Sequence, residues 1–82
     1  MKHDLKCWPA YFQATWVGAK DFEIRKNDRN FKVHDEIVLS EYDPKEDDYT
    51  DRQVEGVITY ITDFKQRTGY VVFNYRPTGR TE

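Results

Sequence analysis

Three charged side chains that can recognise a polar ligand follow Gly18 in close succession: Lys20, Glu23 and Arg25. On a strand, Glu23 and Arg25 project from the same face, about 6–7 Å apart along it. Arginine offers a planar fork of donors for a phosphate or a base edge, lysine offers a mobile point charge, and glutamate accepts from an exocyclic amino group. The triplet therefore predicts a site that reads a base and holds its phosphate. The plainer interpretation is a solvated strand face with an ordinary Glu–Arg pair worth about 0–1 kcal/mol.

The charge balance limits what such a site can bind. The 82-residue chain has 13 basic and 15 acidic side chains, a net charge of −2. Proteins that grip long duplexes through phosphates are normally basic, so a small pocket for a base, a nucleotide or a short single strand is favoured over a large footprint. Residues 20–32 nevertheless hold five basic against three acidic side chains, a local charge of +2 that suits an anionic ligand. Among them, Lys26 and Arg29 join the candidate ligand-binding residues, whereas Lys32 is expected on the open surface.

The elements before the triplet are an opening strand and a helix. Alternation over residues 3–7 predicts a strand with His3 and Cys7 on one face. Side chains at helical spacing follow: Trp8, Tyr11, Phe12, Thr15 and Trp16. They predict an amphipathic helix of about ten residues, with Pro9 in its first turn and Gly18 at its end. We expect this stripe to pack in the core, except that the tryptophan bordering the first strand lines the mouth of a cleft.

Period-two alternation follows the helix. Phe22 and Ile24 alternate with Glu23 and Arg25, which predicts a strand with one apolar and one charged face. Further elements are expected as strands over residues 36–42, 54–64 and 70–75, an exposed acidic loop at 43–48 and a turn at 65–69. Gly56 allows a bend or bulge of the kind that small barrels need.

The order of these elements predicts the fold class. One helix followed by alternating strands with short connections predicts a single α+β domain over residues 1–82, with residues 76–82 as a loose tail. A small, partly closed antiparallel β-barrel, with the one N-terminal helix over one opening, leaves few free strand edges. A chain this short is near the lower limit for a hydrophobic core, and its two Trp, six Tyr and five Phe supply large apolar groups.

The motif Gly18-x-Lys20-x-x-Glu23-x-Arg25 resembles the signature of the ASCH (activating signal cointegrator homology) domain. The stretches over residues 3–12 and 22–33 extend this resemblance, which covers most of residues 3–75 and is similar to a small bacterial and phage family of unknown function. The resemblance implies a PUA-like β-barrel, a fold used widely to bind RNA or modified bases. The ligand-binding residues that it and the charge pattern suggest are Lys20, Glu23, Arg25, Lys26, Arg29, Lys6 and Trp8.

Three classes of function remain open on this resemblance. The first is a binding module for RNA, a nucleotide or a modified nucleobase. The second is an amidohydrolase, because one ASCH branch resembles enzymes that remove the acyl group from N4-acetylcytidine with a Lys, a Thr and a distant Glu. Lys20 matches that Lys and would polarise or attack the amide, while Glu23 would move protons. However, Glu23 stands in place of the Thr, and no Glu of this chain aligns with the distant Glu. The third class is a protein-interaction domain, and binding is favoured over both alternatives.

Other residues indicate structure or argue against further chemistry. Cys7 is the only cysteine, so neither an internal disulfide nor a Cys zinc cluster can form, and the acidic loop lacks EF-hand spacing. No metal or cofactor is therefore expected. His3 is expected to be a hydrogen-bonded structural histidine, and an exposed His34 stands where similar sequences have a turn glycine, so a positive φ there carries a cost or the turn differs. Without an apolar leader or a membrane-length segment, the protein is expected in the cytoplasm, and its oligomeric state stays open.

Overall fold

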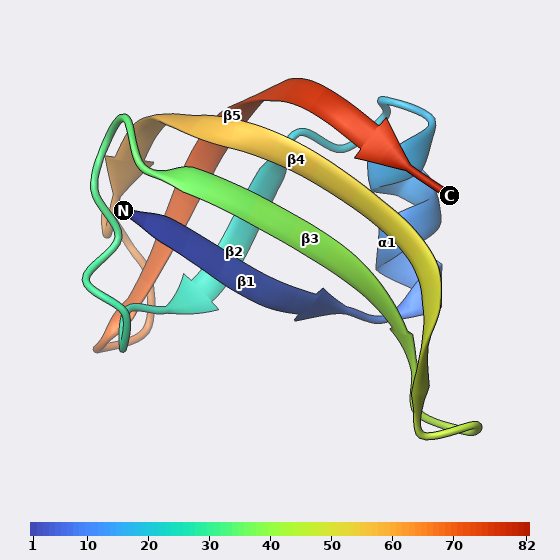
Figure 1. Cartoon of the computed structure of the whole chain (residues 1–82). Coiled ribbons are helices and arrows are strands. Elements are labelled where there is room, and N and C mark those ends of the chain that lie inside the picture. Colours follow the sequence, from blue (N-terminus) through green and yellow to red (C-terminus); the bar gives the residue numbers. More distant parts are fainter.

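Five strands and one short helix make up the fold, and the computed structural model describes all of residues 1–82. In chain order the elements are β1 (Lys2–Cys7), α1 (Pro9–Trp16), β2 (Phe22–Lys26), β3 (Glu36–Asp43), β4 (Asp48–Thr62) and β5 (Tyr70–Thr81). The strands form one sheet in the order β1-β3-β4-β5-β2. The sheet curls until its edge strands, β1 and β2, face each other, and α1 covers one end (Figure 1). A small, barrel-like α+β fold is therefore confirmed.

One pairing departs from the antiparallel barrel that the sequence predicts. β1 runs parallel to β3, whereas the other three pairings are antiparallel. The reason is the connection, because the chain passes through α1 and β2 before it returns beside β1 as β3.

No helix of the structure has both the length and the apolar character that crossing a membrane requires.

Alternate residues of the strands fill the barrel interior. In β1, residues 3, 5 and 7 are buried and residues 2, 4 and 6 are exposed, as the alternation predicts. The largest fully buried side chains come from α1 and from three strands: Phe12, Ile37, Leu39, Ile58 and Phe73. Burying each such side chain contributes about 1.5–3 kcal/mol, so this group contributes substantially to closing the barrel.

The helix buries a narrower strip than its pattern predicts. Phe12 and Thr15 are buried as expected, but Trp8 and Tyr11 are 52% and 62% exposed. The core assignment of Tyr11 is thus wrong, because the eight-residue helix sits over the mouth of the barrel instead of lying across a sheet face. The end of the helix is as predicted: Gly18 has a φ of 82°, and its N–H donates to the carbonyl of Thr15 at 3.1 Å.

Residues 76–81 form a strand and not the loose tail that the sequence predicts. They continue β5 and pair with residues 53–57 of β4. Pro77 ordinarily ends a strand, but here it falls opposite Gly56, where a register shift already interrupts the ladder. A bulge at the Gly56 position of the ladder is therefore confirmed, with its extra residue, Thr78, on the partner strand β5, and it is also what lets the last strand continue.

Two arginines fix the helix to the end of the sheet. The guanidinium carbons of Arg52 and Arg80 lie 4.9 and 4.5 Å from the centre of the Trp16 ring. Arg80 also donates to the Trp16 carbonyl at 3.0 Å. The Arg52 Nε donates to Glu41 at 2.9 Å, and this hydrogen bond lowers the pKa of the Glu41 carboxyl. Helix α1 is thereby held in place as a wall at one end of the barrel.

The loop before β3 contains His34 and also Asp35, the hydrogen-bond partner of His3. His34 has a φ of 81°, so the turn keeps the left-handed geometry in spite of its side chain, which is exposed. Its N–H donates to the carbonyl of Ile58 at 2.8 Å. His3 is buried and its Nε2 lies 2.8 Å from the carboxylate of Asp35, a hydrogen bond that holds the pKa of that carboxyl below its usual value. His3 is therefore the structural histidine that was expected.

Replacing Gly56 by alanine is expected to destabilise the fold. An added Cβ would lie 2.8 Å from Cδ2 of Tyr75 and 3.0 Å from the carbonyl oxygen of Arg76, so the bulge must shift. We expect a loss of about 1–3 kcal/mol in the free energy of unfolding, measured by urea denaturation. Gly79→Ala is the matched control, since its Cβ would meet only Glu55 at an ordinary 3.6 Å. Equal losses in the two variants would contradict the packing argument.

Candidate functional site

The two edge strands are joined by side chains instead of a backbone ladder. β1 and β2 are the ends of the sheet order and do not pair. Arg25, on β2, donates from Nη2 to the carbonyl of Lys6 at 2.8 Å, and Arg29 donates from Nη1 to the carbonyl of Asp4 at 2.7 Å. Both acceptors are free-edge carbonyls of β1. We call this side-chain-closed gap between β1 and β2 the seam.

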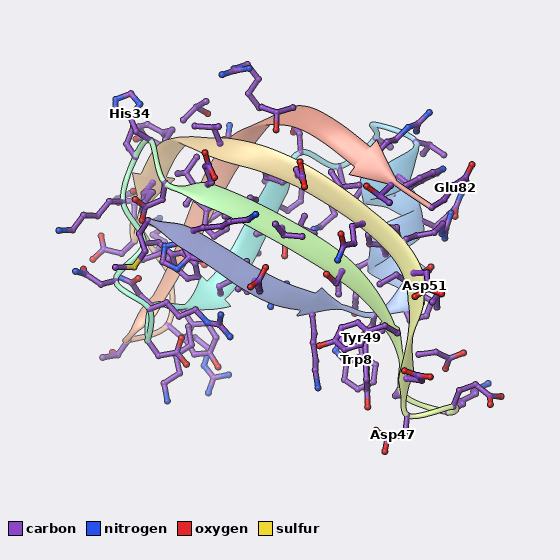
Figure 2. All side chains as sticks on the ribbon, viewed as in Figure 1. Trp8, His34, Asp47, Tyr49, Asp51 and Glu82 are labelled. Atoms are coloured by element: carbon purple, nitrogen blue, oxygen red, sulfur yellow. The ribbon has the colours of Figure 1, made fainter.

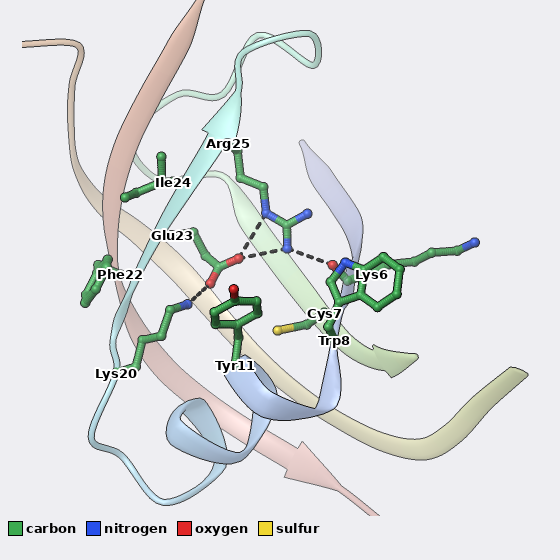
Figure 3. A pocket seen from close by; sticks show the side chains of 9 residues that line it. All are labelled: Lys6, Cys7, Trp8, Tyr11, Lys20, Phe22, Glu23, Ile24 and Arg25. Carbon is green, nitrogen blue, oxygen red and sulfur yellow. Dashed lines mark hydrogen bonds and ion pairs between the residues drawn. The ribbon is translucent and has the colours of Figure 1, made fainter. Parts of the chain in front are cut away.

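A cleft of about 530 Å³ opens where the seam meets α1. Its lining comes from the end of β1, the start of α1, and the segment through β2 (Figure 3): Lys6, Cys7, Trp8, Tyr11, Lys20, Phe22, Glu23, Ile24 and Arg25. The structure thus brings together the predicted triplet, Trp8 and Lys6. It adds Tyr11, Cys7, Phe22 and Ile24, which the sequence patterns did not place in the site.

Strand β2 turns its charged face, and not its apolar face, into the barrel. Glu23 is 4% exposed, whereas Phe22 and Ile24 are 40% and 56% exposed. The register with β5 explains this, because Glu23 lies opposite Phe73 and Arg25 opposite Val71, two residues that point into the barrel. The charged face of β2 is therefore the inner face, and it forms the floor of the cleft.

Burying the Glu23 carboxylate requires partners, and the chain supplies two cations. Nε and Nη2 of Arg25 both donate to Oε1 of Glu23, at 3.0 and 2.8 Å, and Nζ of Lys20 pairs with Oε2 (Figure 3). The side chain of Glu23 is 5% exposed, that of Arg25 is 25% exposed and that of Lys20 is 18% exposed. Two cations against one carboxylate leave the cleft floor with a net charge of +1.

Lys20 is positioned by the turn that ends the helix. Its N–H donates to the carbonyl of Ala14 at 3.1 Å, and its carbonyl accepts from the hydroxyl of Tyr75 at 3.3 Å. The left-handed Gly18 makes this reversal possible, so the side chain of Lys20 points back towards β2. Burial raises the pKa of the Tyr75 hydroxyl to about 12, and the nearby Glu23 acts in the same direction, so this hydroxyl stays protonated as a donor.

These partners leave hydrogen-bonding capacity for a ligand. Lys20 has two further N–H groups, Nη1 of Arg25 makes no hydrogen bond within the protein, and Oε2 of Glu23 has one lone pair to spare. The floor can therefore donate to carbonyl, ring-nitrogen or phosphate acceptors and accept from one adjacent N–H. This pattern matches the edge of a nucleobase.

The helix wall of the cleft carries two exposed aromatic rings. Trp8 and Tyr11 stand one turn apart and both line the cleft. The prediction that Trp8 lines the cleft mouth is confirmed. Tyr11 was missed because helical spacing shows which residues share a face but not how much of that face the core covers.

Cys7 lies in the cleft as a buried, neutral thiol. It is 3% exposed, and its pKa is raised to about 11 by burial, with the charge of Glu23 acting in the same direction. The thiol is therefore neutral at physiological pH, and the thiolate, not the thiol, is reactive.

Three other candidate residues have different roles from those expected. Lys26 is exposed and lies outside the cleft, and Arg29 serves to close the seam. Lys6 contributes its backbone to the cleft, but its ammonium points away and lies 4.2 Å from the centre of the Tyr42 ring (Figure 3). Lys26 and Arg29 therefore do not line this cleft, since Lys26 follows Arg25 on the outer face and Arg29 is used by β1. No group of three or more His, Cys, Asp or Glu side chains is arranged to hold a metal ion.

Fold and site together define a small half-open β-barrel with a polar, aromatic-walled cleft at its seam. Residues 2–75 match a family described as a domain of unknown function (DUF3850), and the chain belongs to that family. It is also 38% identical, over 61 residues, to an uncharacterised 12.9 kDa protein in the GpA 3′ region of Escherichia phage P2. That alignment covers 74% of this chain and 54% of the phage protein, so the chain spans about half the length of this relative.

Exchanging Arg25 for lysine is expected to loosen the seam. Lysine cannot bridge Glu23 and the carbonyl of Lys6 with one planar group, so the seam loses about 1 kcal/mol of hydrogen bonding. Backbone amides of β1 and β2 should then exchange with deuterium about fivefold faster, with the central strand β4 unchanged. The control is Lys26→Ala, an exposed neighbour on the same strand that should leave exchange as it is. Uniform acceleration across all strands would contradict a local role.

Proposed function

We propose that this protein is a binding module for a nucleobase-containing ligand, such as RNA, a nucleotide or a modified nucleobase, held in the cleft at the seam. One observation carries the proposal: the buried carboxylate of Glu23 is fixed between Lys20 and Arg25 beneath two exposed aromatic rings. Fixed polar groups on the floor select hydrogen-bonding edges, while flat rings on the wall favour a planar ligand.

The size and charge of the cleft support a small ligand. A volume of about 530 Å³ is in the range of pockets for small molecules. The net charge of +1 on the floor suits a base that carries one phosphate, in a protein whose overall charge of −2 disfavours a long polyanion. The resemblance to ASCH domains points the same way, and we propose that the barrel is of the PUA-like kind. A free, buried Cys7 fits the cytoplasmic location that we propose with it.

Binding is expected to perturb residues at the cleft and to depend on its floor and wall. We expect cytidine, guanosine, N4-acetylcytidine or their 5′-monophosphates to shift the amide NMR signals of residues 6–11 and 20–25. Glu23→Gln should weaken binding about tenfold by removing the charged acceptor. Trp8→Ala should also weaken binding about tenfold, through lost stacking. Because Trp8 is exposed, this substitution should leave the protein folded.

Lys26→Ala is the matched control, since Lys26 lies beside the cleft without lining it. Affinity equal to the wild type in both cleft variants would contradict the proposal. Shifts confined to the β3–β4 hairpin, and seen only with a protein partner, would favour a protein-interaction domain instead.

A second candidate function, an amidohydrolase for N4-acylated cytidine, rests on the contact between Lys20 and the buried Glu23. In that role Lys20 polarises or attacks the amide and Glu23 moves the proton. Glu23 is the only carboxylate that lines the cleft, so the distant acid of the resembling enzymes has no counterpart there. This leaves binding without turnover as the better-supported function.

The hydrolase candidate makes a separate prediction. If it is correct, purified protein at high concentration converts N4-acetylcytidine to cytidine, and Lys20→Ala abolishes the conversion while circular dichroism stays native. Chromatography of the nucleosides measures this directly. An unchanged substrate after prolonged incubation would eliminate the enzyme and leave the binding module.

A further inference from the structure

A second hollow lies on the other side of β1 from the cleft. It measures about 500 Å³, and the residues that line it on β1, β3 and β4 include Asp4, Lys6, Ser40, Tyr49, Asp51 and Gln53. Lys6 is the one residue that lines both spaces. Because Asp4 and Lys6 are on the exposed face of β1 while Cys7 faces the cleft, the strand itself is the wall between the two.

A run of aromatic rings connects the cleft to this hollow. The ring of Trp8, on the cleft wall, lies 6.5 Å from that of Tyr42, and Tyr42 lies 5.2 Å from Tyr49, centre to centre. Trp8 and Tyr49 appear together at the base of the β3–β4 hairpin (Figure 2). Tyr49 is 47% exposed, so it offers a flat surface on which a second base can stack.

One cation stands between the two spaces. The ammonium of Lys6 lies 4.2 Å from the centre of the Tyr42 ring and 5.9 Å from that of Tyr49, and it forms no ion pair. The adjoining hairpin is rich in aspartate, including Asp47 and Asp48. A single phosphate can therefore be held at Lys6, whereas a longer polyanion along the hairpin would be repelled.

The hollow also offers carboxylates with no partner of their own. The side chains of Asp4 and Asp51 are exposed and take part in no ion pair. A carboxylate that accepts from a ribose hydroxyl is a common element of nucleotide recognition, and the 2′-hydroxyl is the group that separates RNA from DNA.

We propose that this hollow is a second nucleoside subsite, so that the ligand is a short single-stranded RNA and not an isolated nucleoside. One base occupies the cleft, the linking phosphate lies at Lys6, and the next nucleoside stacks on Tyr49 with its ribose hydroxyls towards Asp4 or Asp51. This inference rests on the proposed function, because it adds a neighbour to the base in the cleft. The polar hollow, the aromatic run and the unpaired lysine together carry it.

The test compares ligands of one and two nucleotides by tryptophan fluorescence and calorimetry. A ribodinucleotide such as CpG should bind at least about tenfold more tightly than cytidine or guanosine, and the deoxy form should gain less. Tyr49→Ala should remove the gain while leaving nucleoside affinity unchanged, since Tyr49 does not line the cleft. Asp51→Asn, which keeps the shape and tolerates the φ of 74° at this position, should reduce the preference for ribose.

The outcomes separate this inference from the proposed function. Nucleosides that bind while the dinucleotide binds no better would overturn the second subsite alone. A dinucleotide gain that survives Tyr49→Ala would also overturn it, because the second base would then rest elsewhere. If neither nucleosides nor dinucleotides bind, the proposed function fails and the subsite fails with it.

Discussion

A carboxylate inside a barrel wall has to be neutralised, and this requirement organises the region around Glu23. An unpaired buried charge would cost several kcal/mol, so the carboxylate must keep a cation beside it for the fold to be stable. Lys20 reaches the carboxylate only because the helix ends at Gly18, and Arg25 reaches it from the same strand. Nη2 of Arg25, which also bonds Glu23, then donates its second N–H to the carbonyl of Lys6. The ion pairs that make burial possible therefore also hold the two edges of the sheet together.

This arrangement gives the cleft a rigid polar floor before any ligand arrives. The Arg25 guanidinium is held by Glu23 and by the carbonyl of Lys6, and the backbone of Lys20 is hydrogen-bonded to α1 and to Tyr75. A ligand would replace water on groups that are already oriented, so little side-chain freedom is lost on binding. The helix wall contributes rings with few rotatable bonds, which lowers the same entropic cost.

Sequence patterns predicted the elements better than they predicted the directions in which side chains point. The alternation in β1, the helix with its glycine end, and the bulge at Gly56 were all readable, because each depends on local backbone chemistry. Which face of β2 points inwards was not readable, because alternation separates the two faces without showing which one is inside. The register of β2 with β5 decides the direction. The last half of β5 was not predicted for a related reason: Pro77 is compatible with a strand here because it adjoins a bulge at Thr78 in β5, where the register with β4 shifts. The site residues on β2 were therefore found while their burial was missed.

The parallel placement of β1 beside β3 has a consequence for how the protein folds. Strands β3, β4 and β5 form a meander of neighbours in the chain, whereas β1 pairs across some thirty intervening residues and β2 pairs across nearly fifty. Loop-closure entropy favours the local meander as the early structure, with both edge strands docking later. We therefore expect the seam to be the last part of the barrel to assemble and the first to open on heating.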